Sequence, residues 1–361
     1  MELSALWRRI QRSLFPRIED CLGPLTEEHR KIVAILEIVR IEDQIRQSRR
    51  GTGRPPHDWW PIARAFGTKA ILNLSSTRAL IKRLEADATL RRILGFRSGG
   101  PLPHESAFSR VFGALARTEI PEQTHAALVG RFVKDSGIAH AALDASAIEA
   151  REKARNSRKS VAVKIKRKRG RPKREETVPT PELSGVARYI PMKPSGMKRA
   201  LPGDCSWGAK MNSQGKYEVW KGYKLHVSVV EGGLPVSCLL TSASLHDSQA
   251  APFLLKKTAR KVQGSCLADA AYDAASLRTL EKGLGLVPVI DQNPRRGEKI
   301  PMEPDRAVRY KARTQVERFF ARLKDEFGGR MIYVRGNRKV RTHLMYGVLA
   351  ILADPLLGSV S

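Results

Sequence analysis

Four ionisable side chains recur at fixed intervals in the segment YKARTQVERFFARLK, which runs from Tyr310 to Lys324. The segment consists largely of strong helix formers and contains neither Gly nor Pro, which predicts a helix. At about 100° per residue, Tyr310, Arg313, Glu317 and Lys324 would lie within roughly 60° of one another. One acid, two bases and a phenol would therefore share one face. The alternative is a solvated charged face, stabilised by pairs of residues four apart.

The order and spacing, Tyr-x2-Arg-x3-Glu-x6-Lys, resemble the Y-R-E-K signature of bacterial insertion-sequence transposases with a DDE active site. The resemblance implies that Glu317 is the third of three metal-binding carboxylates. It also implies that Tyr310, Arg313 and Lys324 lie along DNA near the reacting phosphate. The same resemblance requires two aspartates on strands earlier in the chain.

Asp144 is the candidate for the first of these aspartates. The apolar run over residues 138–143 predicts a buried strand that ends at Asp144. Taken alone, Asp144 could equally cap the turn that follows the strand. The surrounding sequence, LDASAIEAREK, resembles the setting of the first aspartate in the family, which implies a catalytic, metal-binding role for Asp144.

Asp269 is the candidate for the second aspartate. Cys266, Leu267 and Ala268 can form a strand that ends at Asp269, and Asp273 can cap a helix that begins near residue 274. The family pattern D-x-x-Y-D matches here, and its first aspartate is the metal ligand. The resemblance therefore assigns the chemistry to Asp269 and leaves Asp273 a structural role, although the reverse assignment stays open.

Three converging carboxylates suit the cleavage of a phosphodiester. The reaction needs an activated nucleophile and shielding of negative charge, which two divalent ions about 3.5–4 Å apart supply together. Mg²⁺ prefers oxygen ligands and keeps several waters, so two or three carboxylates and the phosphate oxygens suffice. We therefore expect two Mg²⁺ ions, for which Mn²⁺ can substitute, at Asp144, Asp269 and Glu317. Hydrolysis would free a 3′-hydroxyl, which would then attack target DNA.

Composition points to a polyanionic partner. Lys and Arg number 65 against 36 Asp and Glu in 361 residues, which gives a formal net charge of +29. Such an excess favours nucleic acid, with counterion release driving affinity. No run of 18 apolar residues predicts a membrane span, and the amino terminus lacks the pattern of a signal peptide. The four cysteines lack zinc spacing, so we expect free thiols and a cytoplasmic, nucleoid-associated protein.

Periodicity divides the chain into two expected domains. Residues 1–135 predict an all-α region that loosely resembles the domain with which these transposases recognise element ends, although a helical bundle without that role is equally consistent. Residues 136–361 predict an α/β domain with strands near 138, 223, 235, 264 and 286. The resemblance implies an RNase H-like fold there, with a mixed sheet flanked by helices. It also implies a homodimer or higher assembly on double-stranded DNA, at element ends and target.

Residues 151–205 differ from both domains in composition. They are first strongly basic and then rich in Pro, Gly and Ser, which predicts a poorly ordered insertion. The stretch KRGRPK within it resembles an AT-hook core, in which Arg169 and Arg171 would enter a narrow A·T minor groove. The alternative is a basic linker that contacts phosphates without sequence preference.

Two further elements leave alternatives open. His246-Asp247 resembles an H-D element of the same family, yet a capped turn before a helix explains it equally well. Lys224 could contact a phosphate, although we expect a lone lysine on a strand to be solvated.

The sequence thus predicts a DNA transposase of an insertion sequence, which binds terminal inverted repeats and catalyses metal-dependent strand cleavage and strand transfer. Two alternatives remain at this stage. One is a catalytically inactive, transposase-derived DNA-binding regulator, and the other is a general RNase H-like nuclease.

Overall fold

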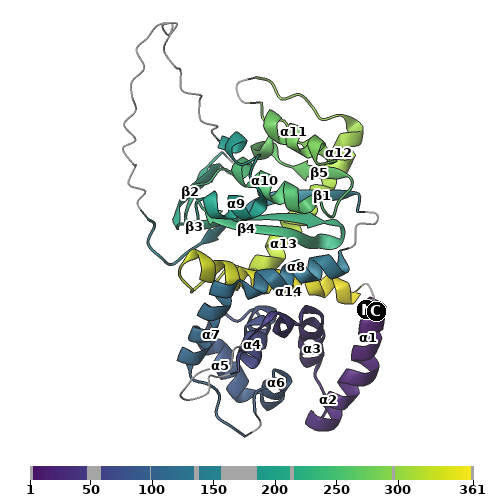
Figure 1. Ribbon diagram of the computed structural model, residues 1–361, viewed down its shortest axis with the longest axis vertical. Helices are drawn as coiled ribbons and strands as arrows, with labels where there is room; N and C mark the ends of the chain where they lie inside the picture. The colour runs from purple at the N-terminus through teal and green to yellow at the C-terminus, as the bar shows by residue number, and fades with distance from the viewer. Residues whose placement is uncertain are drawn as a thin grey trace.

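A computed structural model describes residues 3–46, 58–97, 99–133, 138–155, 185–211, 215–294 and 297–358. Helices make up the amino-terminal part, and a mixed sheet with flanking helices follows (Figure 1). This arrangement confirms the predicted all-α region followed by an α/β domain. Arg169 and Arg171 of the AT-hook-like stretch lie outside the described residues.

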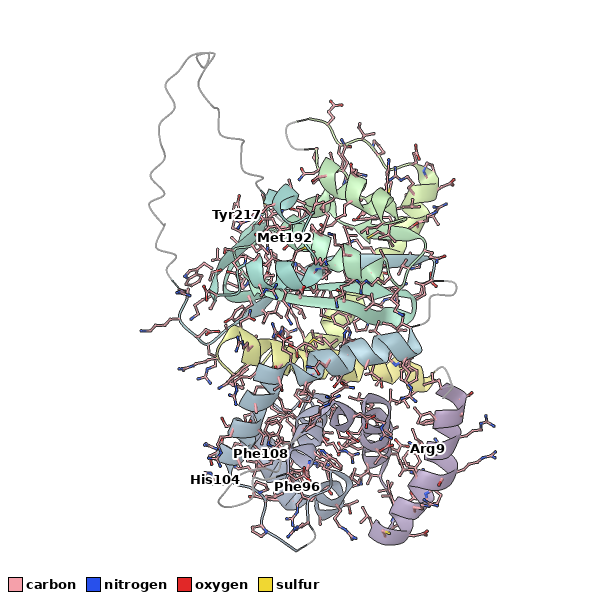
Figure 2. All side chains as sticks on the ribbon, in the orientation of Figure 1. Arg9, Phe96, His104, Phe108, Met192 and Tyr217 are labelled. Atoms are coloured by element: carbon pink, nitrogen blue, oxygen red, sulfur yellow. The ribbon has the colours of Figure 1, made fainter. Side chains whose placement is uncertain are left out.

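The amino-terminal helices follow the predicted apolar periodicity. They are α1 (Leu3–Arg9), α2 (Phe15–Leu22), α3 (Glu27–Val39), α4 (Trp59–Ile71), α5 (Thr77–Ala86), α6 (Ala88–Ile93), α7 (Glu105–Thr118) and α8 (Ile120–Phe132). The structure separates α5 from α6 at Asp87. The Asp87 carboxylate accepts a hydrogen bond from the backbone N–H of Leu90 at 2.8 Å and so starts α6. Phe108 of α7 packs against Phe96, which follows α6 in the chain (Figure 2).

In the described part of the chain, six strands form the mixed sheet. They are β1 (His140–Glu149), β2 (Ser206–Met211), β3 (Tyr217–Val230), β4 (Leu234–Ser242), β5 (Ser265–Ala268) and β6 (Val287–Ile290). Their order is β2-β3-β1-β5-β6, with β4 also paired to β3. The β1–β5 and β5–β6 pairs are parallel, and the β3 pairings are antiparallel. The sequence did not predict β2.

Helices cover the two faces of this sheet. The α13 (Thr314–Asp325) and α14 (Asn337–Gly358) helices share one buried cluster with side chains of β1, β3 and β5. The α10 (Asp247–Thr258) and α11 (Ala275–Gly283) helices belong to a second cluster, which takes the alternate side chains of the same strands. Because side chains alternate along a strand, these two clusters lie on opposite faces.

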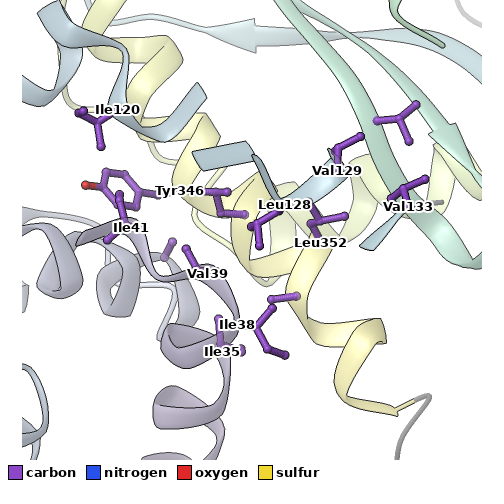
Figure 3. Close-up of a cluster of buried hydrophobic side chains, with 14 of the residues drawn as sticks. Ile35, Ile38, Val39, Ile41, Ile120, Leu128, Val129, Val133, Tyr346 and Leu352 are labelled. Carbon is purple, nitrogen blue, oxygen red and sulfur yellow. The ribbon is translucent and has the colours of Figure 1, made fainter. Parts of the chain in front are cut away.

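The α14 helix joins the sheet to the amino-terminal helices. It contacts α3, α4, α7 and α8 as well as β4 and α13. Buried side chains of α3, α8 and α14, among them Ile38, Leu128 and Tyr346, meet in one cluster (Figure 3). By length and composition alone the segment Asn337–Leu357 could cross a membrane, but 78% of its most apolar window is buried inside the protein. Burial in this shared core therefore accounts for its hydropathy.

The predicted disorder of residues 151–205 is wrong for the carboxyl-terminal part of that range. The α9 helix (Pro194–Ala200) packs there, and the side chain of Met197 is completely buried. The carbonyl oxygen of Met192 (Figure 2) accepts a hydrogen bond from Nζ of Lys256 at 2.8 Å. A few apolar anchors therefore suffice to order a stretch whose average composition is that of a loop.

Gly264 allows a close approach of the chain to β1, just before β5 begins. A Cβ at this position would lie 2.0 Å from the carbonyl oxygen of Ala139. We expect Gly264→Ala to lower the free energy of unfolding by about 2–4 kcal/mol, because the backbone must move apart. Gly283→Ala is the control, since nothing lies within 4 Å of its Cβ, and it should change stability by less than about 1 kcal/mol. Urea unfolding measures both, and equal effects would contradict the prediction.

Candidate active site

Asp144 and Asp269 lie side by side in the sheet. Leu143 pairs with Ala268 across the parallel strands β1 and β5, so the two aspartates occupy the next equivalent positions. Ala142 and Leu267, two residues earlier, face the cluster that contains α13. Alternation along the strands therefore directs both carboxylates toward the face that α13 covers.

The predicted strand end at Asp144 is wrong. β1 continues to Glu149, and its last residues pair with β3 up to Gly222. What ends beside Asp144 is the neighbouring strand, β5, whose last residue is Ala268. The carboxylate therefore stands at the point where one side of β1 loses its partner strand.

Arg313 connects two of the three predicted acids. Its Nη1 donates to Oδ2 of Asp144 at 3.2 Å, and its Nη2 donates to Oε1 of Glu317. The side chains of Arg313 and Asp144 are 18% and 21% exposed, whereas Glu317 is 52% exposed. The guanidinium group of Arg313 therefore bridges Asp144 and Glu317, which are far apart in sequence.

Burial and neighbouring carboxylates raise the cost of ionising both aspartates. Burial, together with the charge of Asp269, raises the pKa of Asp144 to about 6. Burial also raises the pKa of Asp269, and the carboxylates of Asp247 and Asp291 add to this effect. Confined like charges of this kind favour the binding of a cation, because it would relieve the repulsion between them.

The donor chemistry of these acids fits a hard divalent ion. Aspartate oxygens are suitable ligands for Mg²⁺, and Asp144 and Asp269 carry the local excess of negative charge. Within the described ranges, no three His, Cys, Asp or Glu side chains are grouped so that they could hold a metal ion. Glu317 is bonded to Arg313 through Oε1 and is not grouped with the other two acids. In this structure, the positive charge of Arg313 offsets the negative charges of Asp144 and Glu317.

The predicted helix over residues 310–324 is confirmed but contains a tighter turn. Tyr310 ends α12 (Pro304–Tyr310), a 3₁₀ turn covers Lys311–Arg313, and α13 follows. A 3₁₀ residue advances about 120° instead of 100°, so three of them rotate Tyr310 by roughly 60° relative to Glu317. The guanidinium carbon of Arg313 lies 5.7 Å from the centre of the Tyr310 ring.

Lys324 stands apart from the acids. It lies seven residues after Glu317, which is about 10 Å along the helix axis. Partial burial and the positive charges of Lys210 and Arg330 lower its pKa. The structure therefore places Tyr310 and Arg313 near the aspartates and links Glu317 to Asp144 through Arg313. Lys324 lies apart from them, among charged groups of both signs.

Sequence reasoning missed a second layer behind the aspartates. Nζ of Lys224 donates to Oδ1 of Asp247 at 2.9 Å, so the expectation of a solvated lysine is wrong. The charge of Asp247 contributes to the raised pKa of both site aspartates. Tyr272 is buried beside them, and its hydroxyl has no hydrogen-bond partner among the described residues. The His246-Asp247 pair after β4 was the available signal for this layer.

Asp273 is engaged away from the site. Its Oδ1 accepts hydrogen bonds from Nη2 and Nε of Arg278 at 2.8 and 3.1 Å, and its Oδ2 accepts from the backbone N–H of Asn293 at 3.0 Å. The predicted helix cap is wrong, because α11 follows Ala274 and has no side-chain cap. Asp269 does accept a local bond, from the backbone N–H of Ala271 at 2.9 Å.

Two family models match the chain. Residues 135–353 match the family described as "Transposase DDE domain", and residues 18–113 match the family described as "Transposase domain (DUF772)". No curated protein matches the chain significantly, and no solved structure does so. The mixed sheet with its flanking helices is consistent with the RNase H-like fold that the sequence resemblance implied.

Proposed function

Because the chain belongs to the DDE transposase family, we propose that it is the transposase of an insertion sequence, which cleaves DNA at the ends of the element and joins them to target DNA. Enzymes of this family act on nucleic acid and typically use a divalent metal ion. The observation that carries the proposal is the placement of Asp144 and Asp269 at equivalent positions of neighbouring parallel strands, with Glu317 linked to Asp144 through Arg313.

Each side chain of the site has a defined task in this proposal. Asp144, Asp269 and Glu317 hold two Mg²⁺ ions, or Mn²⁺ in their place. The bound ions supply the activation of water and the shielding of phosphate charge. Arg313 releases the carboxylates and moves its charge to the DNA strand, where a fork of N–H donors matches phosphate oxygens.

The remaining predicted residues contact DNA around the scissile phosphate. Tyr310, half-buried beside Arg313, stacks on a base or donates a hydrogen bond to a phosphate. Lys324 binds the backbone farther along the strand, since it lies two helical turns from Glu317. Arg169 and Arg171 contact the minor groove as an AT-hook.

The rest of the molecule serves recognition and assembly. The amino-terminal domain, residues 1–135, binds the terminal inverted repeats, while residues 136–361 carry the chemistry. Two or more copies act together on paired ends, and the protein associates with the nucleoid in the cytoplasm. The net charge of +29 supports all of these contacts with DNA.

A cleavage assay tests the proposal. Linear DNA that carries the sequence flanking the gene should be cut at the repeat in Mg²⁺ or Mn²⁺, and EDTA should abolish the product. Footprinting on the same DNA should show protection of the terminal repeats. Protection without cleavage in either metal would instead support an inactive regulator, and cleavage without any preference for the repeat would support a general nuclease.

A further inference from the structure

A second strongly charged site lies away from the acids, in a groove of about 860 Å³ bordered by α8, α9, β4, α10 and α14. Figure 1 shows β4 and α9 above α8 and α14. We call it the β4 groove. Among the described residues, six Lys or Arg side chains and two Glu side chains line it, and none of the three candidate catalytic acids does.

The two glutamates of the β4 groove are already neutralised. Nζ of Lys198 pairs with Glu119 at 2.7 Å, and Nη2 of Arg341 pairs with the other oxygen of Glu119 at 2.6 Å. Nε of Arg341 also donates to Glu122. Three exposed cations of the groove have no carboxylate partner among the described residues: Lys193, Lys257 and Arg260.

Neighbouring cations of the groove repel Lys257. Partial burial, followed by the positive charges of Arg260 and Lys198, lowers the pKa of Lys257. A lysine whose pKa is lower in the folded than in the unfolded chain binds its proton less tightly when folded. Below that pKa the charge of Lys257 therefore opposes folding, and an anion placed between the cations would offset the repulsion.

A buried hydroxyl adds a hydrogen-bonding group to the same groove. Ser237 of β4 lines the groove and is only 3% exposed, yet its Oγ has no hydrogen-bond partner among the described residues. β4 pairs with β3 on one side, and no described strand pairs with its other edge. A serine hydroxyl can donate to a phosphate oxygen, as serines commonly do in complexes with DNA.

We propose that the β4 groove binds the phosphodiester backbone of DNA at a place separate from the catalytic acids, so that one chain contacts two segments of DNA. This inference rests on the proposed function, which supplies DNA as the polyanion. Lys193, Lys257 and Arg260 neutralise phosphates, and Ser237 donates to one of them. These contacts do not read sequence, because phosphates carry no sequence information.

The salt dependence of DNA binding tests the inference. The double variant Lys257→Ala/Arg260→Ala should lower the slope of log K against log salt by about 2, since each phosphate contact contributes roughly 0.9. Affinity should fall about tenfold or more, equally for repeat and unrelated duplexes. The control is Lys282→Glu on α11, an exposed position outside the groove, which changes the net charge by the same amount and should leave the slope near that of the unaltered protein.

Further variants keep the test independent of folding. Because the cations repel one another, the double variant should unfold at the same or a higher temperature than the unaltered protein. Lys193→Ala, at an exposed position, should lower the slope by about 1. Ser237→Ala should weaken binding about two- to fivefold without changing the slope, because it removes a hydrogen bond and no charge.

The outcomes separate this inference from the proposed function. If the unaltered protein does not bind DNA, the proposed function fails. If it binds DNA, and the double variant and Lys193→Ala both keep its salt slope, the proposed function stands and the β4 groove is not a DNA site.

Discussion

Asp269→Asn should abolish metal-dependent DNA cleavage, with a loss on the order of 10³-fold or more, while Asp273→Asn should keep most of it. The amide in Asp269→Asn has the same size and can still accept the hydrogen bond from Ala271, but it lacks the charge that holds a metal ion. The carboxylate of Asp273 accepts hydrogen bonds from Arg278 and from the backbone N–H of Asn293. Its replacement should therefore cost about 1 kcal/mol of stability and little activity.

The pair of variants decides between the two aspartates of the D-x-x-Y-D pattern. Cleavage of repeat-bearing DNA in Mg²⁺ gives the activity, and thermal unfolding in EDTA gives the stability. Asp269→Asn should also unfold at a temperature no lower than that of the unaltered protein, since it removes one of two like charges that are partly buried together. DNA binding without metal should persist in both variants. Loss of cleavage in Asp273→Asn, with activity kept in Asp269→Asn, would reverse the assignment.

The candidate site was predictable where local patterns determined it. Arg313 and Glu317 are four residues apart in a helical segment, so they lie on neighbouring turns. This placement depends on local sequence and not on contacts with distant segments. Short apolar runs ahead of Asp144 and Asp269 predicted two buried strands, and these strands do pair in parallel. The roles of these residues in metal binding stay predictions.

What escaped prediction depends on contacts between distant segments. The pairing of Lys224 with Asp247 joins β3 to the start of α10, and neither residue has a local pattern that reports it. β2 is only partly buried, so it lacks the apolar run that revealed the other strands. The 3₁₀ turn ahead of α13 is equally invisible, because its residues are good formers of an α-helix.

Hydropathy alone likewise does not predict the environment of the α14 helix. Its composition fits a membrane span or the core of a globular protein, and only the surrounding layers distinguish the two. The sheet lies on one side of α14 and the amino-terminal helices lie on the other, so most of its surface is buried by protein. The two sequence-predicted domains consequently share one continuous buried cluster.

Arg313→Ala should destabilise the metal-free protein by about 2 kcal/mol and, in the same variant, enlarge the stabilisation that a divalent metal provides. Arg313 donates hydrogen bonds to both Asp144 and Glu317. Its replacement by Ala removes these bonds and the positive charge that offsets the two carboxylates. The positive charge of its guanidinium also opposes the binding of a metal ion by these carboxylates. Removal of the arginine therefore removes a competitor, so the rise in unfolding temperature on adding Mn²⁺ should exceed that of the unaltered protein.

The pH dependence of the metal-free protein gives a second readout for Arg313. The pKa of Asp144 is raised to about 6 in the folded chain, so the folded state binds this proton more tightly than the unfolded state does. This group should therefore add stability as the pH falls through about 6, and without the nearby guanidinium the gain should begin at a higher pH. Arg155→Ala is the control, because the ion pair of Arg155 with Asp204 is largely exposed. It should leave both the pH dependence of stability and the metal-induced rise in unfolding temperature nearly unchanged. A metal-induced shift in Arg313→Ala that is no larger than in the unaltered protein would mean that this arginine does not compete with a metal for the acids.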